Sequence, residues 1–185
     1  MTASWTPIAL RRDCAATTIP FGERVALAEG GEVEIVQQLG GSFTVRTEMG
    51  MLLRIDGDDA DALGVDPPTG DTDTDAAGAA GAFDMARVMD ALQTVYDPEI
   101  PVSIVELGLV YRCDEVQRPD GTRLIDIDMS MTAPGCGMGD ILRGDAARVV
   151  GAVPGVDDVE VTLVWDPPWS VGRMSEAARL QLGML

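Results

Sequence analysis

The sequence predicts an α+β protein with three parts: a small all-β module at residues 1–64, a flexible linker at 65–82, and a C-terminal domain at 83–185. Three observations predict this division. Short β-rich runs separated by glycines fill the first third of the chain. A stretch of Pro, Asp, Ala and Gly with few large apolar residues follows. Beyond it, helical and alternating apolar spacing follow one another in the order α-β-β-α-β-α, which predicts a small mixed sheet with helices.

In the first part, β-rich runs occur at residues 8–11, 25–27, 33–36, 43–46 and 51–55. Asp58, Asp59 and Asp61 follow the last run and resemble a fragment of a calcium loop. The remaining ligand spacing and the closing glutamate are missing, so we expect a solvated turn. We find no catalytic group of residues in this module.

In the C-terminal domain, apolar residues at helical spacing predict a helix over residues 83–96, with Asp84 as its N-cap and Asp97-Pro98 at its end. A segment with two prolines, residues 97–108, precedes a predicted hairpin of strands at 109–116 and 124–131. The second strand places Ile127 and Met129 on one face and Asp128 and Ser130 on the other.

A helix at about residues 140–150, a strand at 159–165 and a last helix at 176–182, capped by Ser175, complete the domain. A strand, helix and strand joined in this way predict a right-handed crossover with parallel strands. The loops after these two strands should therefore open onto one crevice, which places Cys136 near residues 165–170.

The turn between residue 131 and the helix that follows contains Cys136 among Gly135, Gly137 and Gly139. A cysteine at a helix start lies near free backbone N–H groups and the positive end of the helix dipole, which favour the thiolate. The glycines allow a ligand or partner to approach the sulfur closely. The local pattern leaves two interpretations open: a reactive or metal-binding thiolate, or a tight turn with a small apolar cysteine.

Composition excludes several kinds of chemistry. The chain has 31 acidic residues against 13 basic ones, all arginine, and it lacks lysine and histidine, which gives a net charge of -18. Without histidine there is no Cys-His pair and no histidine-bound zinc, and without lysine there is no Schiff base. The acidity argues against nucleic acid or an anionic membrane as a partner. We expect no signal peptide and no membrane span.

The three cysteines, Cys14, Cys113 and Cys136, are odd in number and far apart. They form neither a disulfide framework nor a self-contained metal site, so we expect a reducing cytoplasm. If Cys136 binds a metal centre, the missing ligands come from a second subunit, a partner, a small thiol or carboxylates.

Three segments, at residues 97–102 (DPEIPV), 104–111 (IVELGLVY) and 131–136 (MTAPGC), resemble the MIP18 family, also called the domain-of-unknown-function-59 family. The resemblance spans residues 83–185. The glycine-rich cysteine loop, the WDPPW loop at 165–169 and the preceding β-module are similar to the longer, SufT-type members. The resemblance implies an auxiliary factor of the SUF iron–sulfur assembly system, which helps clusters reach client apoproteins and is not an enzyme.

The family's functional positions fall on the thiol of Cys136, the carboxylates of Asp97, Glu99 and Glu106, and the hydroxyl of Thr132. Many members have a proline directly after the cysteine, where this chain has Gly137. The resemblance thus implies Cys136 as a ligand of a transient cluster or of iron. One cysteine cannot hold a cluster that usually takes four protein ligands, so a homodimer with small thiols is one way to complete the set.

Other interpretations stay open. A metal-free protein adaptor would use Cys136 only as part of a docking surface. A thiol-dependent enzyme would need a base or a resolving cysteine, which the sequence does not offer beside Cys136. A role as an accessory component of a ring oxygenase fits poorly with the β-module and the glycine-rich loop. Nucleotide binding fits poorly as well, because Asp140 stands where the dinucleotide fingerprint has its third glycine.

Overall fold

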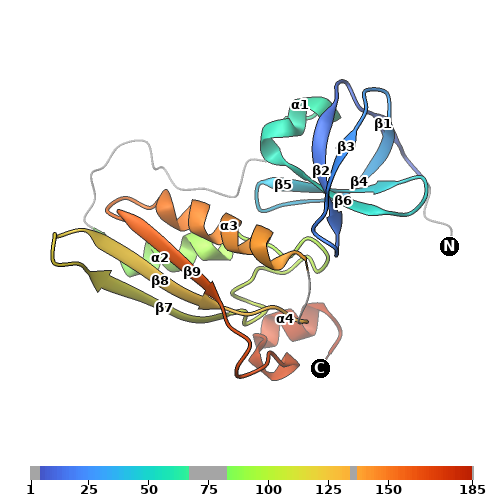
Figure 1. The fold of residues 1–185 in the computed structure, drawn as a ribbon. Coiled ribbons are helices and arrows are strands. Elements are labelled where there is room, and N and C mark those ends of the chain that lie inside the picture. Colours follow the sequence, from blue (N-terminus) through green and yellow to red (C-terminus); the bar gives the residue numbers. More distant parts are fainter. Residues whose placement is uncertain (1–4, 67–82, 134–136, 185) are drawn as a thin grey trace. The chain divides into compact units, whose positions relative to one another are not determined.

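The structure, a computed structural model, describes residues 5–66, 83–133 and 137–184. The chain divides into two compact units, Met1–Thr72 and Asp73–Leu185 (Figure 1). The first unit is built on strands and the second combines helices with a small sheet, which confirms the predicted α+β class. The division falls within the predicted linker, most of which lies outside the described residues.

The first unit is a six-stranded antiparallel sheet in the order β1-β4-β5-β6-β2-β3. Its interior is filled by fully buried side chains, among them Phe43, Val45 and Ile55. The sequence did not predict β2, because its Ala-Ala-Thr-Thr core is only weakly apolar. The strands are β1 (Ile8–Ala9), β2 (Cys14–Ile19), β3 (Arg24–Leu27), β4 (Glu32–Leu39), β5 (Ser42–Thr47) and β6 (Leu52–Asp56).

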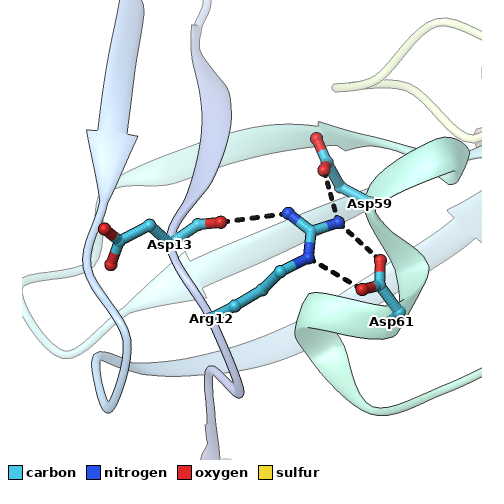
Figure 2. A network of polar contacts seen from close by, with 4 residues as sticks. All are labelled: Arg12, Asp13, Asp59 and Asp61. Carbon is cyan, nitrogen blue, oxygen red and sulfur yellow. Dashed lines mark hydrogen bonds and ion pairs between the residues drawn. The ribbon is translucent and has the colours of Figure 1, made fainter.

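A helical turn, η1 (Gly57–Asp59) and α1 (Ala60–Leu63), follows β6 where we expected a solvated turn. Asp61 is exposed as expected, Asp59 is half-buried, and both bind Arg12. Figure 2 shows the guanidinium of Arg12 between them: Nε donates to Asp61 Oδ2 at 2.7 Å and an Nη donates to Asp59 Oδ1 at 2.8 Å. The hydrogen bond from Arg12 lowers the pKa of the Asp61 carboxyl. The aspartates therefore tie the helical turn to the segment between β1 and β2.

The second unit has the predicted order of elements and the predicted mixed sheet, in the order β7-β8-β9. Strands β7 and β8 are antiparallel, and β8 and β9 are parallel. Figure 1 shows α3 running alongside β9. The elements are α2 (Met85–Gln93), β7 (Val110–Gln117), β8 (Arg123–Met129), α3 (Gly139–Gly151), β9 (Asp158–Leu163), η2 (Val171–Arg173) and α4 (Glu176–Gln181).

Packing and capping explain these elements. The inward side chains of β8, Ile125, Ile127 and Met129, are fully buried, which fixes the register because a slip by one residue would bury aspartates. Both predicted helix caps are confirmed. Asp84 Oδ1 accepts from the Ala86 N–H at 2.9 Å, and Ser175 Oγ accepts from the Ala178 N–H at 3.0 Å. Within the described part of the chain, no helix is both long enough and apolar enough to cross a membrane.

If the two units have independent cores, a cavity in one should leave the other intact. We predict that Phe43→Ala destabilises the first unit by about 3–5 kcal/mol, the usual cost of removing a buried phenylalanine side chain. Amide hydrogen exchange should then speed up in β4, β5 and β6 and stay unchanged in β8 and α3. Faster exchange in β8 as well would show that the units unfold together.

Candidate functional site

The two ends of the cysteine loop meet at the carboxyl end of β9. The parallel register pairs Met129 with Leu163, and the Val164 N–H donates to the Met129 carbonyl at 2.8 Å. On the other side of the loop, a Cβ placed on Gly139 would lie 3.2 Å from Leu163 Cδ1 and 3.6 Å from Met131 Cγ. Glycine at the first position of α3 therefore allows the helix to start in contact with Met131, two residues beyond β8, and with Leu163 at the end of β9.

Of the predicted loop residues, Gly135 and Cys136 lie outside the described residues. Thr132 is half-buried and Gly137 is exposed. The N-cap residue of α3 is Met138, whose side chain makes no capping hydrogen bond. No side chain at the cap therefore uses the first N–H groups of this 13-residue helix, and the positive end of its dipole faces the loop.

The other two thiols have environments that disfavour the thiolate. Cys14 on β2 is buried in the core of the first unit, and burial raises the pKa of its thiol. Cys113 on β7 is half-buried, and burial, with the charge of Asp114 as a second cause, raises the pKa of its thiol to about 11. Both cysteines are free thiols, and at neutral pH both are protonated.

Asp97, the first predicted carboxylate, stabilises the turn formed by the residues that follow it. Its Oδ1 accepts from the backbone N–H groups of Glu99 and Ile100, at 2.9 Å each. Asp97 is buried, and burial raises the pKa of its carboxyl even though the two N–H groups oppose this shift. Glu99, the second predicted carboxylate, has an exposed side chain. The structure gives Asp97 a turn-forming role that the sequence pattern did not reveal.

Glu106, the third predicted carboxylate, binds the C-terminal segment. Its Oε2 accepts a short hydrogen bond from the hydroxyl of Ser175, and its backbone carbonyl accepts from the Ser175 N–H at 2.9 Å. The same hydroxyl caps α4. Glu106 and Ser175 are far apart in the sequence, so no spacing rule pointed to this pair.

Three more contacts fix the C-terminal segment on residues 107–111. Trp169 Nε1 donates to the Leu107 carbonyl at 2.8 Å. The Arg173 guanidinium lies 3.6 Å from the centre of the Tyr111 ring. Gly108 has a φ of +68°, and a Cβ there would lie 2.1 Å from the Arg173 carbonyl oxygen. The Glu106-Leu107-Gly108 run thus serves as a docking platform for residues 169–175.

Ser130 is a polar residue that sequence reasoning misplaced. The alternation of β8 put it on the outward face with Asp126 and Asp128, but its side chain is 1% exposed. Its N–H donates to the Leu109 carbonyl at 2.8 Å, and its Oγ has no hydrogen-bond partner among the described residues. A buried hydroxyl without a partner therefore lies two residues before Thr132, where the loop begins.

Within residues 5–66, 83–133 and 137–184, no group of three or more Cys, Asp or Glu side chains is arranged to hold a metal ion. Asp97 and Glu106 are instead engaged with backbone and hydroxyl donors. The described residues around the cysteine loop are the end of β8, the start of α3 and the end of the neighbouring strand β9.

Comparison with known proteins shows which family has this arrangement of strands, loop and helix. Residues 85–163, from the start of α2 to the end of β9, match the family model described as iron–sulfur cluster assembly protein. A relative from Porphyromonas gingivalis, named Fe-S protein maturation auxiliary factor, is 41% identical over 98 residues, which are 53% of this chain and 90% of the relative. The chain belongs to the iron–sulfur cluster assembly protein family. The predicted family membership is therefore confirmed.

A second named relative supports the same assignment, and a solved structure is similar over about the same share of the chain. The Fe-S protein maturation auxiliary factor SufT from Staphylococcus aureus is 38% identical over 90 residues, which are 49% of this chain and 98% of that protein. A solved structure of a domain of unknown function 59 from Bacillus anthracis covers 54% of this chain and 92% of its own, with 40% identity and a TM-score of 0.46. The matches span about half of this chain and nearly all of each relative.

We predict that Asp97 acts through its acceptor oxygen. D97N keeps an acceptor for the Glu99 and Ile100 N–H groups. D97A leaves both N–H groups without this acceptor and should lower the free energy of unfolding by about 1–3 kcal/mol.

Because the folded-state pKa of Asp97 is raised, its ionisation opposes folding as pH rises through that pKa. Wild-type stability relative to D97N should therefore increase as the pH is lowered toward 4, measured by urea unfolding. A D97N variant as unstable as D97A would contradict this role.

We also predict that Gly108→Ala detaches the C-terminal segment. The new Cβ would collide with the Arg173 backbone, and a positive φ adds strain for alanine, so stability should fall by more than about 1 kcal/mol. Limited proteolysis should then cut within residues 165–184, whereas Gly121→Ala, also at positive φ but with open space around it, should leave this segment protected. Equal protection in both variants would exclude the platform role.

Proposed function

We propose that this protein is an auxiliary iron–sulfur maturation factor that holds a cluster briefly and passes it to client apoproteins. The observation that supports it most strongly is the family match over residues 85–163, which encloses the strand, the cysteine loop and the helix in one domain. The names of the relatives from Porphyromonas gingivalis and Staphylococcus aureus support the same role. We further propose the SUF assembly proteins as its partners.

Cys136 is the cluster ligand in this proposal. The chain has three cysteines, and the environments of Cys14 and Cys113 keep their thiols protonated. Of the three, only Cys136 stands shortly before a helix in the sequence, two residues before the N-cap Met138, whose side chain offers no acceptor. Free backbone N–H groups at a helix start lower the pKa of a nearby thiol and donate to cluster sulfur atoms. In this proposal Gly135 and Gly137 let the cluster approach the backbone, Gly139 lets the helix start pack against Leu163, and Thr132 lies at the start of the loop.

The cluster is cargo in this scheme. A cluster usually takes four protein ligands, and one cysteine per chain leaves the set incomplete. A second copy with its own Cys136, together with small thiols, would complete it. A cluster held by few protein ligands exchanges readily onto an apoprotein that offers more of them, which is the property that a carrier needs.

We propose that the protein is not an enzyme and that it works in the cytoplasm. The chain lacks histidine and lysine, so no general base of either type stands beside the thiol. Cys14 and Cys113 are free thiols, which suits a reducing compartment.

The test is anaerobic reconstitution with iron and sulfide, followed by iron analysis and visible absorption across a sizing column. We expect the wild-type protein to acquire a sulfur-to-iron absorption band and Cys136→Ala to acquire none. Cys113→Ala is the matched control, because this thiol belongs to the same unit and is protonated at neutral pH. It should bind as much iron as the wild-type protein.

Two outcomes would contradict the proposal. Equal iron in wild-type protein and Cys136→Ala would place the cluster elsewhere. Iron in none of the three proteins would leave a metal-free adaptor as the better description. Elution of the coloured fraction as a dimer would identify a second copy as the source of further ligands.

A further inference from the structure

Two tryptophans in the loop after β9 have opposite environments. Trp169 is half-buried, and its indole N–H donates to the Leu107 carbonyl at 2.8 Å, so packing and a hydrogen bond explain it. Trp165 is 45% exposed, and its indole makes no hydrogen bond to any described residue. An exposed tryptophan leaves a large apolar area in contact with water. Tryptophan is also among the residues most often found as anchors of protein interfaces.

Trp165 follows the strand end at which the described ends of the cysteine loop, Met131 and Gly139, come together with Leu163. It follows Leu163 by two residues, and Leu163 contacts the position where α3 begins. Its neighbour Val164 is hydrogen-bonded to the Met129 carbonyl, two residues before Met131. A protein that docks at these described ends of the loop therefore docks within two residues of Trp165 along the chain.

Two exposed aspartates lie close in sequence to Trp165 and to the described end of the cysteine loop. Asp166 follows it directly and is exposed. Asp140, next to Gly139 at the other end of the loop, has a side chain that is 78% exposed, and Arg143 is its only ion-pair partner within the described residues. The whole chain has a net charge of -18. An apolar anchor with acidic neighbours is complementary to an apolar segment with basic neighbours.

We propose that Trp165 is the anchor of a client-docking surface, and that its partner is an apolar segment of an apoprotein, flanked by arginine or lysine and lying beside the cysteines that receive the cluster. This inference deepens the function proposed above and rests on it. The acidic residues Asp140 and Asp166 attract the basic flank, and the indole of Trp165 packs on the apolar part. Docking then brings the acceptor cysteines next to the loop.

The test uses full-length, cluster-free protein and a labelled synthetic peptide with two cysteines, several leucines and several arginines. Its twin has glutamate at every arginine position. Fluorescence anisotropy should show that wild-type protein binds the arginine peptide and not the glutamate peptide. Trp165→Ala should weaken this binding by about 10-fold or more, the effect expected for a tryptophan anchor. Asp166→Asn should weaken it by a smaller factor, and added salt should have the same effect.

Leu180→Ala is the matched control, because Leu180 is also a large exposed apolar residue of this unit, at 67% exposure on α4. It should bind the arginine peptide as the wild-type protein does. Equal binding by Trp165→Ala would overturn the proposal, as would a loss of the same size in Leu180→Ala. Binding of both peptides alike would overturn the stated partner chemistry.

Sizing chromatography of the same samples tests the alternative occupant. If the wild-type protein is a dimer and Trp165→Ala is a monomer, the indole contacts a second copy and the proposal is wrong. Because these proteins contain no cluster, the result is independent of reconstitution. Failure of docking with successful reconstitution rejects this inference alone, whereas the reverse rejects the carrier role alone.

Discussion

The parallel pairing of β8 with β9 is the constraint on which the rest of the second unit depends. An antiparallel β9 would put the loop after it at the opposite edge of the sheet from the cysteine loop. The parallel register instead brings Met131, Leu163 and the first residue of α3 into contact. Right-handed crossovers place α3 over the sheet, so the helix start, with no capping side chain, lies at this same edge. Sheet topology therefore creates the site before any reactive side chain is considered.

The motif carboxylates show how a sequence signature can reflect structure instead of chemistry. Asp97 and Glu106 were candidate functional residues because the family resemblance places its acidic signature positions on them. In the structure, Asp97 accepts two backbone N–H groups and Glu106 accepts the Ser175 hydroxyl. An acid that is already used as a backbone acceptor is a poor metal ligand, because coordination would break those bonds. Their contribution to the site is to hold the segments that border it.

Much of the fold could be predicted from the sequence. Alternating residues in β8, helical spacing in α2 and α3, and the caps at Asp84 and Ser175 are local signals, and all agree with the structure. Strand β2 was missed because alanine and threonine give little hydrophobic contrast. Arg12 with Asp59 and Asp61, Glu106 with Ser175, and the burial of Ser130 all depend on contacts between segments distant in sequence. Alternation and spacing carry no information about such contacts.

The protonation of each thiol depends on its local backbone and on the side chains that pack around it. Cys14 and Cys113 lie on strands, where burial and neighbouring carboxylates oppose the thiolate. Cys136 lies in the sequence between a strand end and a helix start, and a negatively charged sulfur is favoured at that place by backbone dipoles alone. In a chain with net charge -18, no lysine and no histidine, the sources of positive potential beside a thiol are arginine side chains and backbone dipoles. The proposed role of Cys136 as a cluster ligand therefore depends on its place in the sequence shortly before a helix start, because the chain has neither lysine nor histidine to stabilise a thiolate there.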